Sequence, residues 1–111
     1  LPPDRAPPTQ YPVSRWVLGG RDADWKPFDN FLGGRGVVYR LAGPARANAL
    51  LYVVENDQVE DAADLPAAHP FSTAGCCASA WREGGLLYVL VVEGDRADYE
   101  RFLNRPHGPV A

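Results

Sequence analysis

The stretch that most constrains the fold is residues 73–104, whose pattern predicts a strand, a tight turn, a second strand and a helix. Its centre, residues 86–92, is the longest apolar run of the chain, Leu-Leu-Tyr-Val-Leu-Val-Val. The run is too short and too rich in β-branched residues for a membrane helix, so it predicts a strand buried on both faces. We expect residues 75–82 to form its hairpin partner, with the Glu-Gly-Gly sequence at 83–85 as the turn.

A helix is predicted to follow this hairpin. Asp95 is a suitable N-cap, and Tyr99, Phe102 and Leu103 have the spacing i, i+3, i+4 that places them on one helix face. Asn104 precedes an Arg-Pro sequence that ends the helix.

The N-terminal third of the chain predicts three elements. Residues 1–12 hold five of the eleven prolines, which predicts an extended linker or stalk. Residues 13–18 alternate in polarity after a proline, which predicts a short edge strand. A short helix is expected to begin at Asp22 or Asp24 and to end at the glycines 33–34, because its apolar residues have helical spacing; they are Trp25, Phe28, Phe31 and Leu32.

Residues 35–41 and 48–55 predict another hairpin, joined by the turn-rich segment 42–47. Its second strand is apolar on both faces, like 86–92, so these two strands are expected at the centre of one sheet. Residues 56–70 read as a solvated acidic loop. The predicted fold class is α+β: a mostly antiparallel sheet of about five strands, made of two hairpins and an edge strand, with a short helix and a C-terminal helix on one face.

The totals fit one domain, which we place at residues 13–104, followed by a flexible tail at 105–111. The net charge of −3 and the scattered basic residues argue against nucleic acid and anionic membrane as partners. No stretch could span a bilayer and no signal peptide opens the chain, so we expect it to be soluble as given. Because it begins at Leu1 and contains no methionine, we interpret it as a processed product or a piece of a longer protein.

Cys76 and Cys77 are the most unusual dipeptide. Adjacent residues of a strand point to opposite faces, so the two thiols can neither bind one metal together nor form a relaxed disulfide. One interpretation is two packed thiols, and another is a redox pair. His69 lies shortly before them, so a thiol-dependent redox protein or small enzyme using Cys76, Cys77 and His69 is a second hypothesis of function.

Other motifs assign no catalytic, cofactor-binding or metal-binding residue. The glycines at 33–36 match no phosphate-binding pattern, and the acidic loop lacks the calcium-binding frame. Most aromatic residues follow apolar periodicity and are expected in the core. Trp25 and Trp81 are the two that we expect could line a surface groove.

Residues 75–103, with Trp81 ending a strand, a Gly-Gly turn, an apolar strand and a final helix, resemble the C-terminal extracytoplasmic domain of bacterial transmembrane anti-sigma factors. Upstream, the Gly-Gly-Arg strand at 31–39 and the apolar strand at 49–54 are similar to the same family, so the resemblance covers residues 31–103.

The resemblance implies a non-enzymatic sensor, regulatory or interaction domain that acts in transcription regulation and needs no cofactor. The parent protein would have a cytoplasmic sigma-binding segment, one membrane helix and this domain on the periplasmic side of the inner membrane, with residues 1–12 as the stalk. A sigma factor would then be bound only through the upstream segment, whose zinc motif is not in this chain. We expect the domain itself to recognise a protein or small ligand through the sheet face or the long loop.

Overall fold

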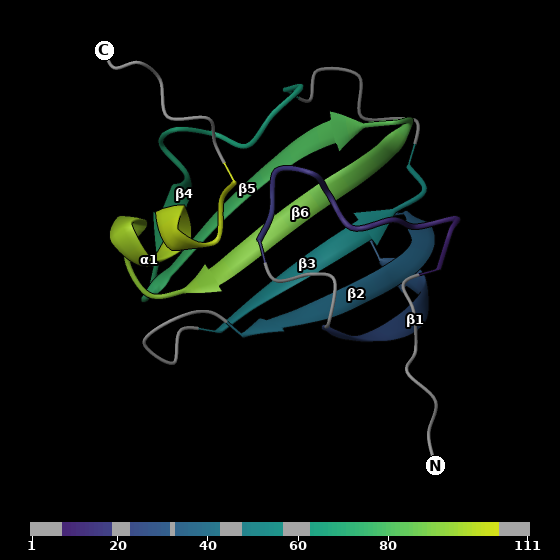
Figure 1. The fold of residues 1–111 in the computed structure, drawn as a ribbon, viewed down its shortest axis with the longest axis horizontal. Coiled ribbons are helices and arrows are strands. Elements are labelled where there is room, and N and C mark those ends of the chain that lie inside the picture. The colour runs from purple at the N-terminus through teal and green to yellow at the C-terminus, as the bar shows by residue number, and fades with distance from the viewer. Residues whose placement is uncertain (1–7, 19–22, 32, 43–47, 57–62, 105–111) are drawn as a thin grey trace.

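The computed structural model describes residues 8–18, 23–31, 33–42, 48–56 and 63–104. Within these ranges the chain forms one six-stranded antiparallel sheet with the strand order β1-β2-β3-β6-β5-β4, and one short helix (Figure 1). The elements are β1 (Asp24–Phe31), β2 (Gly34–Ala42), β3 (Asn48–Val54), β4 (Phe71–Thr73), β5 (Cys76–Glu83), β6 (Leu86–Glu93) and α1 (Arg96–Arg101).

The centre of the sheet is as the sequence predicts. The two most apolar strands, β3 and β6, are neighbours in the middle of the sheet, with Leu51 opposite Leu90. Both side chains are fully buried. The predicted hairpins β2–β3 and β5–β6 are confirmed, and Gly84 and Gly85 form the turn of the second with positive φ angles of 60° and 83°. That conformation is unstrained only for glycine, which explains the Gly-Gly pair.

One face of the sheet is covered by α1 and by residues 8–18, which we call the strap (Figure 1). The strap crosses the middle strands of the sheet, and α1 packs beside it on β5 and β6. Beneath these two segments lies the hydrophobic core, whose sheet residues are Val37, Tyr39, Leu41, Ala49, Leu51, Val53, Cys77, Trp81, Tyr88, Leu90 and Val92.

The C-terminal helix is confirmed with its predicted N-cap, but it ends at Arg101, before the predicted end at Asn104. Asp95 is the N-cap and forms a reciprocal capping box with Asp98. Tyr99, Phe102 and Leu103 are buried against the sheet. The segment after the helix also holds the strap, because the Leu18 amide donates to the Phe102 carbonyl at 2.7 Å. The covered face is therefore closed by two segments that also bind each other.

The predicted helix at residues 22–32 is wrong, because residues 24–31 form the edge strand β1. Its pairing with β2 shifts register between Phe28 and Phe31. This irregularity puts Phe28 and Phe31, three positions apart, on the same side of the strand, with their ring centroids 5.6 Å apart. A bulged strand thus reproduces the helical spacing that misled the prediction.

The predicted edge strand at 13–18 is also wrong, since this segment belongs to the strap and bridges only Val17 to Leu103. The linker prediction for residues 1–12 needs a correction at its end, because the carbonyls of Tyr11 and Pro12 accept hydrogen bonds from the sheet. The sheet has six strands instead of about five, with β4 as the extra one, and α1 is the one helix that covers a face within the described chain.

Several predictions fall where the structure gives no description. Residues 1–7 of the predicted stalk, residues 57–62 of the acidic loop and the predicted tail at 105–111 lie outside the described residues. Among the residues that are described, the helix α1 is far too short to cross a bilayer.

Candidate interaction face

The second face of the sheet lies opposite the strap and α1, and none of the described helices or strands covers it. Its residues alternate with the core residues along β2, β3, β5 and β6. We call this the open face and define it by the residues Val38, Arg40, Asn48, Leu50, Cys76, Ala78, Val89, Val91 and Glu93. Leu50, near its centre, is 36% exposed.

One end of this side of the sheet is closed by an aromatic cluster. Phe31 stacks on Tyr52 with ring centroids 4.4 Å apart, and Phe28 lies 6.2 Å from the same ring. Beside them Val54 and Leu87 are buried. At this end Gly36 permits the close approach of β2 to β3, because a Cβ there would lie 1.8 Å from the Val53 carbonyl oxygen. The curled strand β1 therefore limits the open face to the opposite end of the sheet.

The open face is hollowed along its length. A shallow cavity of about 500 Å³ is lined by Arg40, Asn48, Ala49, Leu50, Cys76, Val91 and Glu93. A smaller hollow of about 170 Å³ adjoins it and shares Arg40 and Leu50; its other lining residues are Asp24, Trp25, Lys26 and Val38. Together they form a groove that crosses the sheet with an apolar floor and charged ends.

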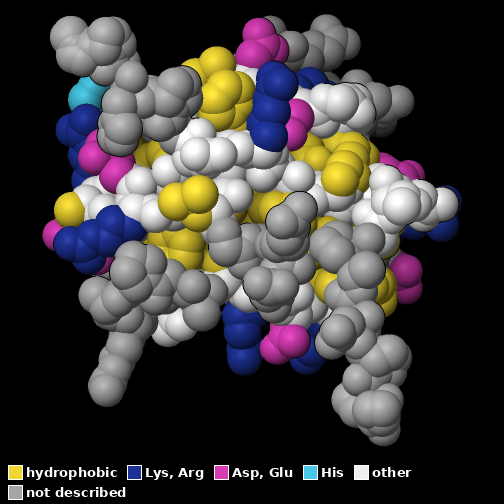
Figure 2. All heavy atoms as spheres, in the orientation of Figure 1, with side chains coloured by type: hydrophobic (Ala, Val, Ile, Leu, Met, Phe, Trp, Pro, Cys, Tyr) yellow, Lys and Arg dark blue, Asp and Glu magenta, His cyan; other side chains and the backbone are white. Residues whose placement is uncertain are grey.

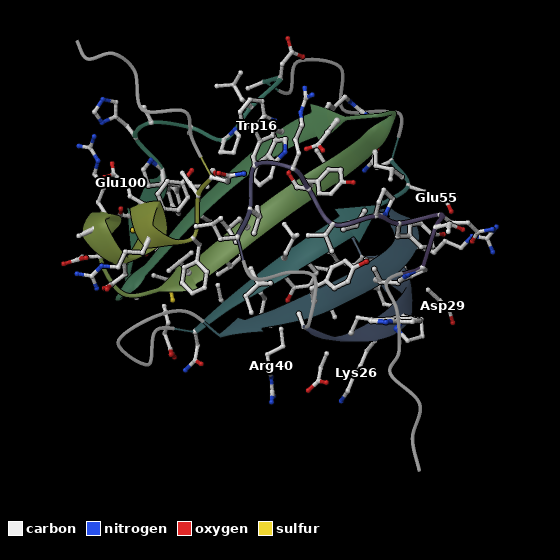
Figure 3. The ribbon with its side chains drawn as sticks, viewed as in Figure 1. Trp16, Lys26, Asp29, Arg40, Glu55 and Glu100 are labelled. Carbon is white, nitrogen blue, oxygen red and sulfur yellow. The ribbon has the colours of Figure 1, made fainter. Side chains whose placement is uncertain are left out.

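The charged residues differ between the two ends of this groove. Arg40, Lys26 and Asp24 line one end, where Asp24 is paired with Arg40 across β1 and β2. The Arg40 and Lys26 side chains extend from the β1–β2 side of the sheet (Figure 3). Glu93 lies at the other end and accepts one hydrogen bond, at 3.4 Å, from the Asn48 amide. Within the described part of the chain, Arg40, Lys26 and Glu93 form no ion pair.

The covered face has a different kind of polar group. The Tyr39 hydroxyl donates to the Tyr11 carbonyl at 2.6 Å, and the Tyr88 hydroxyl donates to the Pro12 carbonyl at 2.7 Å. Burial raises the pKa of Tyr39 to about 12, and burial followed by the nearby Glu83 charge raises the pKa of Tyr88 above its ordinary value. Both hydroxyls therefore stay protonated and hold the strap.

Glu83 is the second anchor of the strap. Its carboxylate accepts from the Ser14 hydroxyl at 2.6 Å, from the Arg15 amide at 3.2 Å and from the Trp81 indole at 3.2 Å. No sequence pattern indicates this role, because Glu83 stands next to a turn and is 68 residues or more from its strap partners. Figure 2 shows the covered face, where charged side chains lie mainly around the margin.

The structure places the two cysteines on opposite faces, as strand geometry requires. The Cys77 thiol lies in the core, 3.4 Å from the Ser72 hydroxyl and 3.7 Å from the Gly94 carbonyl oxygen. Cys76 is half-buried in the larger hollow of the open face. Both are free thiols. His69 is exposed, and within the described residues no hydrogen bond joins it to either cysteine.

The two tryptophans expected at a surface groove differ. Trp81 needs a correction, because it is fully buried and stacks on Tyr88 with centroids 5.9 Å apart. Its alternation with Cys77 and Ser79 puts it on the covered face, where the strap lies over it. Trp25 is half-buried and lines the smaller hollow. It also pairs with Tyr39 and packs against the hydrophobic core, so it belongs to the covered side of the sheet.

In the ranges that the structure describes, no group of three or more His, Cys, Asp or Glu side chains is arranged to hold a metal ion. In the acidic loop Asp64 is exposed, and Glu55, just before the loop, accepts a hydrogen bond from Tyr11 and lies 3.8 Å from Arg35. Comparison of the chain with known proteins gave no matching family model, no matching curated protein and no matching solved structure.

Proposed function

We propose that this chain is a non-enzymatic interaction domain that binds a partner through the open face of its sheet. One observation carries the proposal: the outward positions of the two central strands are apolar. A solvated antiparallel sheet ordinarily alternates apolar residues toward the core with polar residues toward water. Here Leu50, Val89 and Val91 occupy positions that would be polar in such a sheet.

The hydrophobic core does not include these outward residues. The core lies on the other face, where Leu51, Leu90 and Val92 are fully buried beneath the strap and α1. Contiguous apolar surface rimmed by polar groups is typical of binding sites in soluble domains. The groove on the open face has this composition, with Arg40 at one end and Glu93 at the other.

The setting of the domain is the second part of the proposal. From the resemblance of residues 31–103 we infer an extracytoplasmic regulatory domain in an anti-sigma-factor-like membrane protein. In that setting the open face carries the regulatory contact, and a sigma factor is bound by the upstream cytoplasmic segment. The open face supports the interaction part of this proposal, and the resemblance alone supports the membrane-bound setting.

The setting is tested by reading the parent gene upstream of Leu1. We expect an apolar segment of about 20 residues, long enough for one membrane helix, preceded by a cytoplasmic segment with a His/Cys zinc motif. A cleavable signal peptide alone, or an immediate start codon, would contradict the setting and leave the interaction proposal to be tested by itself.

The regulatory role of the open face is tested in the full-length parent with a sigma-dependent reporter. We expect Leu50→Glu to change reporter output, because it places a charge in the groove. Leu65→Glu is the matched control, since Leu65 is 51% exposed in the segment before β4 and away from the groove. Equal output from wild type and both variants, at equal protein levels, would overturn the regulatory role.

A further inference from the structure

We propose that the partner of the open face is a second copy of this chain, packed face to face in a two-fold symmetric dimer. This inference rests on the proposed function, because it names the partner of the same surface. It comes from the arrangement of charges on the open face, which is complementary to itself.

The relevant residues form one row across three strands. Arg40 in β2 pairs with Leu50 in β3, and Leu50 pairs with Val91 in β6. Arg40 and Val91 therefore flank Leu50 on its two sides. Glu93 lies two residues beyond Val91 on the same face of β6, about 6.6 Å along the strand.

A two-fold axis parallel to β3, between two facing sheets, exchanges the positions of β2 and β6. Such an axis places Arg40 of one copy opposite Val91 of the other copy. The other copy's Glu93 lies two residues further along β6, and its carboxylate is within reach of the Arg40 side chain. Because a two-fold contact is reciprocal, the dimer contains the Arg40–Glu93 pair twice.

The apolar residues fit the same arrangement. Leu50 lies on the axis and meets its own symmetry mate, and Val38 of one copy faces Val89 of the other, since both pair with Tyr52 from opposite sides. Facing sheets pack about 10 Å apart with their strands nearly aligned. The pairing would convert the exposed side of the sheet into the inner layer of a sandwich.

The positions of Arg40 and Glu93 favour a second copy over a small ligand or an unrelated protein. The two have opposite signs and flank one apolar centre. Asp24 is the cross-strand neighbour of Arg40 in its own chain, but neither Arg40 nor Glu93 forms an ion pair within the described residues. A second copy supplies a carboxylate for Arg40 and a guanidinium for Glu93. The pairing of β2, β3 and β6 places both partners at matching positions along the strands. Complementary rims of this kind fix the register of an interface.

The test is sedimentation equilibrium of the 111-residue chain and its variants over a dilution series. We expect a concentration-dependent dimer for the wild type and a monomer for Leu50→Glu. Arg40→Glu and Glu93→Arg should each weaken dimerisation at least about tenfold, because each places two pairs of like charges in the interface. The double variant Arg40→Glu/Glu93→Arg should restore most of the affinity.

Arg35→Glu is the matched control, since Arg35 shares the strand side of Val37 and Tyr39 and is 71% exposed in its side chain. It should dimerise like the wild type, and circular dichroism should show all variants folded. A wild type that stays monomeric at every concentration, a dimer that survives Leu50→Glu, or a double variant as weak as the single ones would overturn the dimer. A monomer whose Leu50→Glu form still alters the reporter would keep the proposed function and assign the face to a different protein.

Discussion

Both faces of the sheet are apolar along the central strands β3 and β6, yet only one is covered by the described chain. Along β6, Leu90 and Val92 are fully buried, while Val89 and Val91, which alternate with them, are only partly buried. The faces differ in what their polar groups do. On the covered face, tyrosine hydroxyls and Glu83 bind the strap, whereas on the open face Arg40 and Glu93 lack an ion pair within the described residues. Polar anchors, more than apolarity, distinguish a face that its own chain covers from one left for a partner.

The sharpest comparison uses neighbouring residues of β6. Leu90→Asp should unfold the domain, because it buries a charge with no partner at a fully buried central position. We expect a loss of more than about 4 kcal/mol in the free energy of unfolding, measured by urea denaturation. Val89→Asp changes the adjacent residue on the open face and should cost about 1 kcal/mol or less. A cooperatively folded Leu90→Asp protein, or equal losses in both variants, would contradict the assignment of the faces.

A second comparison removes one carboxylate from each face. Glu83→Ala leaves the Ser14 hydroxyl and the Trp81 indole without their acceptor, so we expect a loss of about 2–3 kcal/mol in thermal or urea unfolding. Glu93→Ala removes one long hydrogen bond at an exposed position and should change stability by less than about 0.5 kcal/mol. Similar losses would show that Glu83 does not anchor the strap.

The strap should also loosen at high pH. The pKa of Tyr39 is raised to about 12 in the folded protein, so its protonated hydroxyl stabilises the fold fully below pH 10. That contribution is lost as the pH rises from 10 to about 12, and Tyr88 acts in the same direction. Tyr39→Phe should lower stability at neutral pH and flatten this alkaline decline in urea unfolding series. If the stability of Tyr39→Phe declined as steeply with rising pH as that of the wild type, ionisation of Tyr39 would not be a cause of the decline.

The smallest expected difference is between the two cysteines. Cys77→Ser places a more polar hydroxyl in the core and should destabilise by about 1 kcal/mol, although Ser72 and the Gly94 carbonyl offer partners. Cys76→Ser, in the half-buried hollow, should be nearly neutral in thermal unfolding. If Cys76→Ser lowered the thermal stability more than Cys77→Ser, the assignment of Cys76 to the open face and Cys77 to the core would be contradicted.

The sequence was sufficient wherever local signals and buried pattern agree. The apolar runs in β3 and β6, the Gly84-Gly85 turn and the Asp95 cap each specify their element without long-range information. The opposite orientation of Cys76 and Cys77 also followed from strand alternation. These features depend only on neighbouring residues.

The remaining features depend on contacts between distant residues. The bulge between Phe28 and Phe31 is defined by pairing with β2, so the segment alone resembles a helix. The strap has no regular pattern of its own and is fixed by Tyr39, Tyr88 and Glu83. For the same reason the open face could not be identified, because the sequence does not say which face of an apolar strand the strap will cover.

The difference between the two faces is tested most directly by the reaction rates of the two thiols with a thiol-specific reagent. The rates are measured in Cys76→Ser and Cys77→Ser over a dilution series. In Cys77→Ser, we expect the remaining Cys76 to react in the native state, more slowly as rising concentration closes the open face in the dimer. In Cys76→Ser, the remaining Cys77 should react only as fast as the domain unfolds. A Cys77 thiol that reacts in the native protein as fast as Cys76 would contradict the account of a covered and an open face.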